Sequence, residues 1–559
     1  MVHAIDLLNA HVADSFAGRW FRLEGSSHPK ERIGSRFTTE IRAGLTTWAM
    51  AYIISVNAQI ISDSGGTCVC STNDTCPTGS NADYDACIND VRLDLITTTA
   101  GISALASFLM GLLANLPVGM APGLGLNAYF AYSIVGFHGS GIISYREALS
   151  AVFLEGWIFF ILSIFGLRQW LVRIMPQSLV LAVGAGIASG GLGVIGGDPV
   201  NFVGLGGCLP QDMIDGFPGF CTHGVLRSPT MWLGVFLGGI LTVLLMLYRV
   251  RGAILIGIFL TSVVSWPRPT AVTYFPHTDA GDALFDYFKQ VVTFHRLQKV
   301  GNVIDVRRVW YALITFLYVD ILDTTGTLYS MAKFAGLRDP LTLDFENSTI
   351  AYCVDAFSIS MGALMGTSPV TAFIESATGI SEGGKTGITA MVTGLCFLVS
   401  VFFAPIFASI PSWATGGALV IVGSLMMRNV VSVNWDYIGD AVPAFLTIII
   451  IPLSYNIAYG VIAGILSYLV LNGIPWIITR LSGGRIVPPN IEMSEEFIVP
   501  PGGLIPLWLR KLTGRVQEDE DTEVPLEVRG AGSSNEDTDA RSEKTDDASV
   551  SEQPKHIVR

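Results

Sequence analysis

Two aspartates and two threonines share one face of a predicted membrane-spanning helix. Within an otherwise apolar run they follow the spacing i, i+3, i+4 and i+7: Asp320, Asp323, Thr324 and Thr327. This spacing places their side chains along one side of an α-helix. An ionisable side chain inside a span is costly and marks a functional site by default. We expect these carboxylates to accept hydrogen bonds from a ligand or to carry a proton, although Asp323 could instead cap a broken backbone.

A further carboxylate, Glu375, lies in the second half of the chain, between Phe373-Ile374 and Ser376-Ala377. Two deep carboxylates cannot both stay charged without partners in a low dielectric, so one of them should hold a proton. Such a pair suits a ligand that offers hydrogen-bond donors, such as the ring N–H and amino groups of a nucleobase, with a proton as the coupling ion. It suits a bare anion badly.

Two interruptions of helical sequence lie beside these polar side chains. Proline and glycines interrupt the apolar run within 120–129, just before Asn127. They do so again within 366–375, just before Glu375. Non-helical backbone at membrane depth is tolerated only when it is buried in protein or lines a cavity. Paired breaks in the two halves of a chain indicate a transporter's midplane binding site. Reentrant turns with a packing role only are the alternative.

Composition predicts a polytopic membrane protein. Half of the 559 residues are hydrophobic and 14% are charged, compared with roughly 25% in a soluble domain, and the mean hydropathy is +0.52. Apolar runs near the roughly 20 residues that cross a bilayer predict spans at 43–63, 93–115, 147–167, 177–196, 230–248, 309–329, 349–366, 386–408, 415–430, 439–455 and 457–478. A shorter run at 253–266 and the two broken segments make fourteen, an all-α polytopic fold.

The membrane region is predicted to form two halves of seven spans each, 43–266 and 309–480, joined by a loop at 267–308, with one break in each half. An odd number of spans per half makes the two repeats inverted in the membrane. The region 1–42 is polar and amphipathic and is not predicted to be a signal peptide, so we expect the first span to serve as the targeting signal. The tail 481–559 is acidic and is predicted to be largely disordered, as a solubilising tail or as a trafficking or turnover signal.

Charges and cysteines predict the orientation. Arg32, Arg36 and Arg42 precede the first span and favour cytoplasmic termini, although the basic loop 267–308 then falls outside. The predicted outer loops hold six disulfide candidates, Cys68, Cys70, Cys76, Cys87, Cys208 and Cys221. Their pairing cannot be chosen from the sequence. Asn73, in Asn-Asp-Thr, is a candidate glycosylation site in the same cysteine-rich loop.

At these residues the chain resembles the AzgA-like purine permeases, a branch of the nucleobase transporters. The resemblance rests on motifs that occur together in this order: Ala121-Pro-Gly-Leu-Gly-Leu-Asn-Ala-Tyr-Phe130, Val319-Asp-Ile-Leu-Asp-Thr-Thr-Gly-Thr327, Gly366-Thr-Ser-Pro-Val-Thr371 with Ile374-Glu-Ser376, and Ser381-Glu-Gly-Gly-Lys-Thr-Gly387. They lie in a membrane region that runs from Gly44 to Ile478. The long tails and the cysteine-rich loop resemble those of fungal plasma-membrane members.

The resemblance implies fourteen spans as 7+7 inverted repeats with core and gate domains, and short strands in the broken third and tenth spans. It also implies proton-coupled uptake of adenine, guanine and hypoxanthine. The candidate substrate-binding residues are Asp320, Glu375, Asn127, Gly125 and Thr371, and the candidate proton-coupling residues are Asp323, Asp320 and Thr324. One departure, Pro369 where many relatives carry Ser or Thr, bears on the strand geometry.

Two other classes of function compete with a proton symporter for purine bases. An anion exchanger or channel of the same architecture would need cations at the midplane, where this sequence places carboxylates. A membrane-embedded enzyme would need a catalytic cluster, and no His-Glu-x-x-His motif occurs. We therefore expect no metal, no cofactor and no nucleic acid. The expected partners are a purine base, a proton and the lipid bilayer of the plasma membrane, and a homodimer is left open.

Overall fold

The computed structural model describes the following residues: 2–68, 82–141, 143–166, 178–179, 181–182, 213–214, 217–221, 229–248, 250, 252–267, 306–337, 345–454 and 457–494. The chain divides into two units, Met1–Pro506 and Leu507–Arg559. The second unit lies outside the described residues, as do most of the predicted loop 267–308 and most of the predicted span 177–196.

Helices dominate the described part of the first half of the chain. In chain order its elements are α1 (Val2–Ala13), α2 (Phe16–Phe21), α3 (Phe37–Thr47), η1 (Trp48–Tyr52), α4 (Ile53–Ser62), α5 (Ala82–Leu109), η2 (Met110–Ala114), β1 (Met120–Pro122), α6 (Leu124–Ala128), η3 (Tyr129–Ile134), η4 (Phe137–Gly139), α7 (Tyr145–Ile164), β2 (Met213–Ile214), β3 (Phe217–Cys221), α10 (Pro229–Leu233), η7 (Gly234–Leu241), α11 (Thr242–Leu247) and α12 (Ala253–Ser265). The strands β2 and β3 form a separate antiparallel pair.

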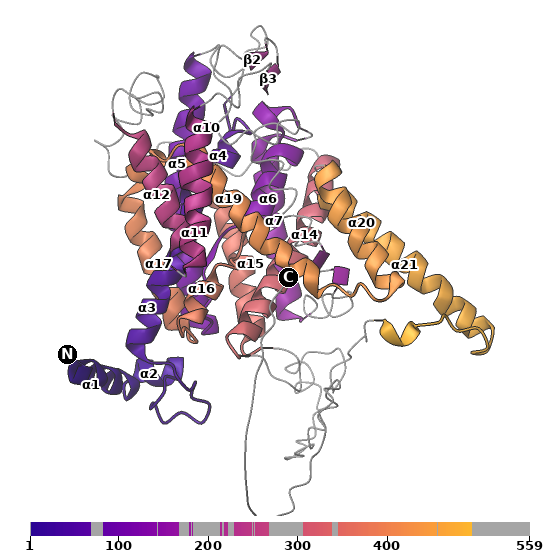
Figure 1. The fold of residues 1–559 in the computed structure, drawn as a ribbon, viewed down its shortest axis with the longest axis horizontal. Helices are drawn as coiled ribbons and strands as arrows, with labels where there is room; N and C mark the ends of the chain where they lie inside the picture. Colours follow the sequence, from indigo (N-terminus) through magenta and orange to yellow (C-terminus); the bar gives the residue numbers. More distant parts are fainter. Residues whose placement is uncertain are drawn as a thin grey trace, which may run out of the picture. The chain divides into compact units, whose positions relative to one another are not determined.

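The second half of the chain is also mostly helical and includes one short strand among its described residues. Its elements are α14 (Val306–Phe334), α15 (Ser348–Met365), β4 (Val370–Ala372), α16 (Ser376–Ser381), α17 (Gly387–Phe402), α18 (Ala404–Ala408), α19 (Ser412–Met426), η8 (Met427–Ser432), α20 (Ile438–Ser454), α21 (Ile457–Leu481) and η9 (Ile491–Met493). Figure 1 shows the paired helices α20 and α21 side by side.

The predicted membrane spans coincide with helices wherever the structure describes them. Among the described residues, four helices are long and apolar enough to cross a membrane: Ala86–Ala114, Tyr145–Ile164, Ser348–Met365 and Tyr459–Leu481. Shorter apolar helices occur at Gly234–Leu247, Ala253–Ser265, Gly387–Phe402 and Ile438–Leu453. The all-α fold with a few short strands is therefore confirmed. The number of spans and the division into repeats at 43–266 and 309–480 stay predictions.

The two predicted breaks meet as a short antiparallel pair of strands. Met120 of β1 lies opposite Ala372 of β4, and Pro122 lies opposite Val370. Proline disfavours helical geometry in the residue before it, so Pro122 and Pro369 keep the chain extended at these positions. Pairing the two strands satisfies backbone groups that would otherwise be unpaired at membrane depth.

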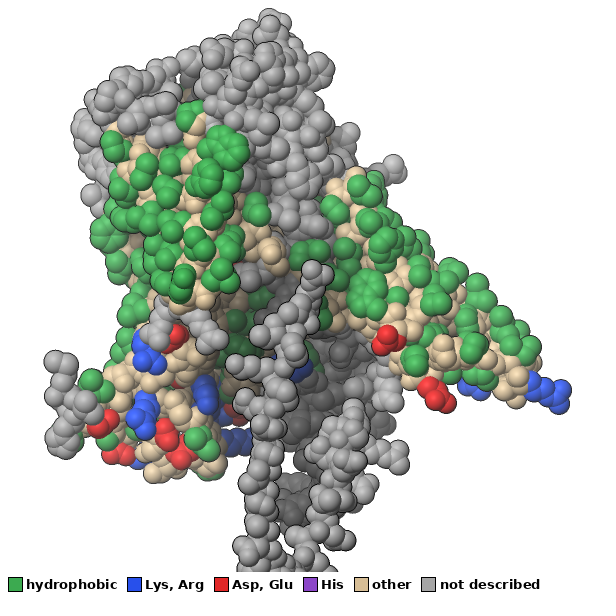
Figure 2. Space-filling model, in the orientation of Figure 1, with side chains coloured by type: hydrophobic (Ala, Val, Ile, Leu, Met, Phe, Trp, Pro, Cys, Tyr) green, Lys and Arg blue, Asp and Glu red, His purple; other side chains and the backbone are tan. Residues whose placement is uncertain are grey.

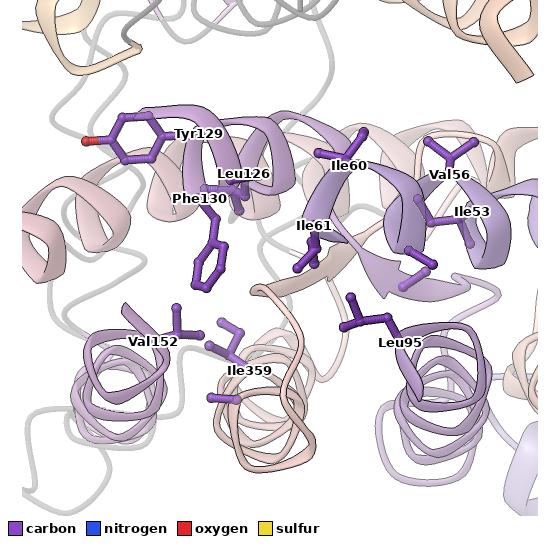
Figure 3. Close-up of a cluster of buried hydrophobic side chains, with 14 of the residues drawn as sticks. Ile53, Val56, Ile60, Ile61, Leu95, Leu126, Tyr129, Phe130, Val152 and Ile359 are labelled. Atoms are coloured by element: carbon purple, nitrogen blue, oxygen red, sulfur yellow. The ribbon is translucent and has the colours of Figure 1, made fainter. Parts of the chain in front are cut away.

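A large apolar core surrounds the first break. Figure 3 shows Phe130 of η3 pointing toward Val152 of α7 and Ile359 of α15. Leu126 and Phe130 are both fully buried, and α7 packs along α15. The half-helix that follows β1 is therefore held by apolar contacts from both halves of the chain.

One part of the outer surface is mainly hydrophobic and another part carries many charged side chains. Figure 2 shows hydrophobic side chains covering the region of α10, α11 and α12, and charged side chains gathered beneath it over the amino-terminal helices. Phe236, Leu247 and Phe259 are among the exposed apolar residues of this region. An exposed apolar band bordered by charges is expected of a surface that faces lipid.

Candidate functional site

The strand pair β1–β4 forms the frame of the candidate site. Its hydrogen bonds continue beyond the strands, because Gly123 N donates to Pro369 O at 3.1 Å and Phe373 N donates to Gly119 O at 3.1 Å. The hydroxyl of Ser107 on α5 both donates to and accepts from the backbone of Met120. The backbone at the two breaks is therefore fixed by partners from both halves and from α5.

Asn127 lies on α6, directly after the first break. Its side-chain oxygen accepts a hydrogen bond from the hydroxyl of Ser368 at the second break. The side chain is fully buried, and its Nδ2 has no hydrogen-bond partner among the described residues. A buried amide without a partner is costly to the protein alone. This group therefore presents two N–H donors that a bound ligand could accept from.

Glu375 lies at the start of α16, after the second break. Its Oε1 accepts a hydrogen bond of 2.6 Å from the hydroxyl of Tyr52 on η1. The backbone carbonyl of Glu375 accepts a second bond, from the Thr378 hydroxyl. The carboxyl group is thus held in place by Tyr52, a residue of the predicted first span that is far from Glu375 in the sequence.

The two aspartates of α14 are three residues apart, and one of them, Asp323, also acts on Glu375. Thr324 Oγ1 donates a hydrogen bond of 2.6 Å to Asp320 Oδ1, as expected for side chains at i and i+4 on one helical face. Asp323 interacts electrostatically with Asp320 and with Glu375. Asp323 therefore acts on both its neighbour Asp320 and Glu375, a carboxylate from a distant part of the sequence.

Two smaller candidates lie on the strands and the half-helix. Thr371 is buried in β4 opposite Ala121. A side chain on Gly123 would place its Cβ 2.8 Å from Thr371 Oγ1, so this close approach requires glycine. Gly125 lies on α6 and is partly exposed.

Sequence reasoning missed two residues of the first span that hold the site. One is Tyr52, and the other is Asn57, which is fully buried on α4 and donates to the hydroxyls of Thr99 and Thr367 at 2.7 and 3.0 Å. An amide in the apolar run Ile53–Ile61 was an available signal, because a polar side chain in a span needs a partner on another helix.

The motif Ser381–Gly387 forms hydrogen bonds with Glu40, near the amino-terminal end of the chain. Lys385 N and Thr386 N donate to the carboxylate of Glu40 on α3, at 3.0 and 3.1 Å, and Thr389 Oγ1 donates at 2.6 Å. Burial raises the pKa of the Glu40 carboxyl, and these hydrogen bonds oppose the rise. Because the motif joins α16 to α17, α3 is tied directly to the helix that follows Glu375.

Two of the six disulfide candidates, Cys68 and Cys87, form a bridge between described residues. It links the turn after α4 to α5. The side chain of Cys221, at the end of β3, is not described, and Cys70, Cys76, Cys208 and Asn73 lie outside the described residues. Their predicted roles stay predictions.

Comparisons with known proteins relate this chain to membrane transporters. A family model described as "Permease family", for xanthine and uracil permeases, matches residues 79–462. The chain is 54% identical over 556 residues to a protein of Aspergillus versicolor named efflux pump notK', covering 94% of this chain and 96% of that protein. It is 36% identical to the guanine/hypoxanthine permease PbuG of Bacillus subtilis, covering 78% of this chain and 91% of PbuG.

The adenine permease AdeP of Escherichia coli is 32% identical, over 78% of this chain and 88% of its own length. Among solved structures, that of SLC26A9 has a TM-score of 0.50 and 12% identity, covering 82% of this chain and 70% of that chain. This likeness concerns the fold alone.

Proposed function

Because this chain belongs to the xanthine/uracil permease family, we propose that it carries purine nucleobases across the plasma membrane together with protons. The chain is a multi-pass membrane permease, and its relatives are transporters, not enzymes. The substrates proposed are adenine, guanine and hypoxanthine, which are the bases named in PbuG and AdeP.

The single observation that supports this proposal is the pairing of the two breaks, with Asn127 just after the first break, Glu375 just after the second, and Asp323 of α14 acting electrostatically on Glu375. Asn127 offers unpartnered N–H donors, and the carboxylates offer acceptors. A purine base presents ring nitrogens that accept and N–H groups that donate, so it can satisfy both kinds of group at once. A site with buried polar groups of both kinds discriminates strongly against ligands that leave one of them unpaired.

Proton coupling is proposed from the charges around the site. The charged groups that act on Asp323 are carboxylates, those of Asp320 and Glu375. Three negative groups in a low dielectric favour binding of a proton. We assign substrate contact to Asp320, Glu375, Asn127, Gly125 and Thr371, and proton coupling to Asp323 with Asp320 and Thr324. The same charges disfavour an anion exchanger.

The test is uptake of radiolabelled adenine by cells that lack purine uptake of their own. Expression of the chain should produce uptake that unlabelled guanine and hypoxanthine compete with and that sulfate and bicarbonate do not. A protonophore should abolish accumulation above the external concentration. Uptake of sulfate without uptake of any base would overturn the proposal, and equal accumulation with the protonophore would remove the proton from it.

A second candidate function, export, is favoured by the name of the Aspergillus versicolor relative, an efflux pump at 54% identity. Preloaded vesicles of known orientation distinguish the two directions. If the chain exports, an inward proton gradient drives labelled base out of the vesicles. If the chain takes up bases by proton symport, the same gradient drives labelled base inward.

A further inference from the structure

The amino-terminal segment, residues 2–36, is fixed to the ends of several helices. Arg32 donates to the carbonyls of Asn115 and Lys385, and burial lowers the pKa of its guanidinium, against the charge of Glu346. Arg22 also forms an ion pair with Glu346, just before α15. The position of α1 and α2 relative to the spans is therefore set by specific contacts.

Two large aromatic side chains on α2 are nevertheless exposed. Phe16 is 82% exposed and Trp20 is 50% exposed, and their rings stack with centroids 6.3 Å apart. They occupy positions i and i+4, which share one face of a helix. The opposite side of α2 is buried at Gly18 and Phe21. The short helix is thus apolar on two sides, only one of which packs on the protein.

This exposed pair lies at the end of a membrane span. Trp20 Nε1 donates a hydrogen bond of 3.0 Å to the carbonyl of Leu112. Leu112 belongs to η2, which ends the apolar span Ala86–Ala114, and the next residue, Leu113, is 45% exposed. The aromatic pair therefore continues a lipid-facing surface. Tryptophan is enriched at this depth because its ring is apolar and its N–H is polar.

Basic side chains occur on α2 and in the segment that follows it. Arg19 lies between Phe16 and Trp20 on α2 and is exposed. Arg36 and Arg42 are more than half exposed, and each pairs with a glutamate. Figure 2 shows the charged side chains of this region just beneath the hydrophobic surface. Basic groups near a bilayer are attracted to anionic lipid headgroups. The combination of exposed aromatic and basic groups fits a lipid surface better than it fits water.

We propose that α2 lies on the membrane as an interfacial anchor, with Phe16 and Trp20 inserted at the boundary between headgroups and acyl chains of the adjacent leaflet. The occupant of this surface is the phospholipid bilayer. Ile5 and Leu8, exposed at i and i+3 on α1, extend the apolar surface along the same segment. The anchor holds the segment whose Arg32 contacts the Ser381–Gly387 motif.

The test places a photoreactive side chain on the full-length protein in phosphatidylcholine vesicles with and without phosphatidylserine. Phe16→p-benzoylphenylalanine should form at least about fivefold more lipid adduct than the control Lys30→p-benzoylphenylalanine, because Lys30 is exposed in the same segment but is a charged loop residue. Lipid adducts at equal yield from both positions, or crosslinks between two copies of the chain in place of lipid adducts, would overturn the proposal.

A second measurement keeps the test independent of crosslinking chemistry. Brominated lipids quench tryptophan fluorescence at the depth of the acyl chains, so the quenched fraction should be smaller in Trp20→Phe than in the unaltered protein. Trp435→Phe is the matched control, because Trp435 is also exposed and also donates to a backbone carbonyl. An unchanged quenched fraction in Trp20→Phe would contradict the proposed insertion.

Discussion

At the scale of single residues, a hydrogen bond from another helix determines which oxygen of the Glu375 carboxyl group is open to other partners. The Tyr52 hydroxyl occupies Oε1 of the carboxyl group, which orients the group and leaves Oε2 as the oxygen for other partners. Asn127 is oriented in the same way, since Ser368 occupies its oxygen and leaves its N–H groups. Each of these side chains thus has one polar atom bound by the protein, and we propose that its other polar atom binds the substrate.

Glu375→Gln should reduce adenine uptake at least about tenfold, because charge-assisted hydrogen bonds contribute roughly 1.5 to 3 kcal/mol. The measurement is initial uptake rate at equal surface expression. Glu382→Gln is the matched control, since Glu382 lies after the same helix, is not a candidate site residue, and pairs with Arg42, which is more than half exposed. Equal losses in both variants would contradict a specific role for Glu375.

Tyr52→Phe should raise the KM for adenine at least about threefold, because a lost hydrogen bond to a charged group costs roughly 1.5 to 3 kcal/mol, of which repositioning of Glu375 recovers a part. Tyr132→Phe removes a similar bond, 2.7 Å to Asp63 Oδ2 at the end of α4, that involves no candidate site residue, and should leave KM unchanged. If the two variants raise KM equally, Tyr52 does not position Glu375 for the substrate.

The two aspartates of α14 should behave differently. Asp320→Asn should abolish high-affinity binding of adenine, because Asp320 is assigned to the substrate. Asp323→Asn should keep detectable binding and change the pH dependence of transport, because Asp323 is assigned to proton coupling. Equilibrium binding to each purified variant, measured beside transport at several external pH values, checks both. Loss of binding in Asp323→Asn with binding kept in Asp320→Asn would exchange the two roles.

At the scale of elements, the strand pair β1–β4 controls how closely the two breaks approach. The glycine at 123 faces the Thr371 side chain across the pair, and Pro122 and Pro369 remove backbone donors that a helix would need. We therefore expect substitutions that add side-chain atoms between the two strands to disturb their pairing.

Gly123→Ala should reduce transport at least about tenfold, because an added Cβ 2.8 Å from Thr371 Oγ1 forces the strands apart. Gly101→Ala is the control: its added Cβ would meet only the mobile end of Met365, at 3.3 Å. Surface expression and uptake of both variants would be compared. Normal transport by Gly123→Ala would show that the close approach is not required.

At the scale of the whole molecule, the Cys68–Cys87 bridge and the amino-terminal segment should lie on opposite sides of the membrane. In intact cells, an impermeant thiol reagent should label Cys68 and Cys87 only after reduction, because bridged sulfurs do not react as thiols. A protease added outside should leave residues 2–36 intact. Labelling that requires permeabilisation would invert the proposed orientation.

Contacts between residues that are close in the sequence could be predicted from their spacing. The shared face of Asp320 and Thr324 follows from positions i and i+4 on one helix, and the structure shows their contact. The bonds Tyr52–Glu375 and Asn127–Ser368 join residues from distant parts of the chain, so only the tertiary packing specifies them. The docking of Arg32 and Glu40 was missed as well, because their polar segment has no periodic pattern that would indicate a buried role.

The pairing of β1 with β4 has a consequence for how the protein is made. When β1 enters the bilayer during synthesis, its partner strand in the second half has not yet left the ribosome. The unpaired backbone groups of β1 must then be satisfied by water or by the insertion machinery until β4 arrives. A chain truncated before Val370 would keep an open strand edge within the membrane, and we expect quality control in the cell to recognise it as unfinished.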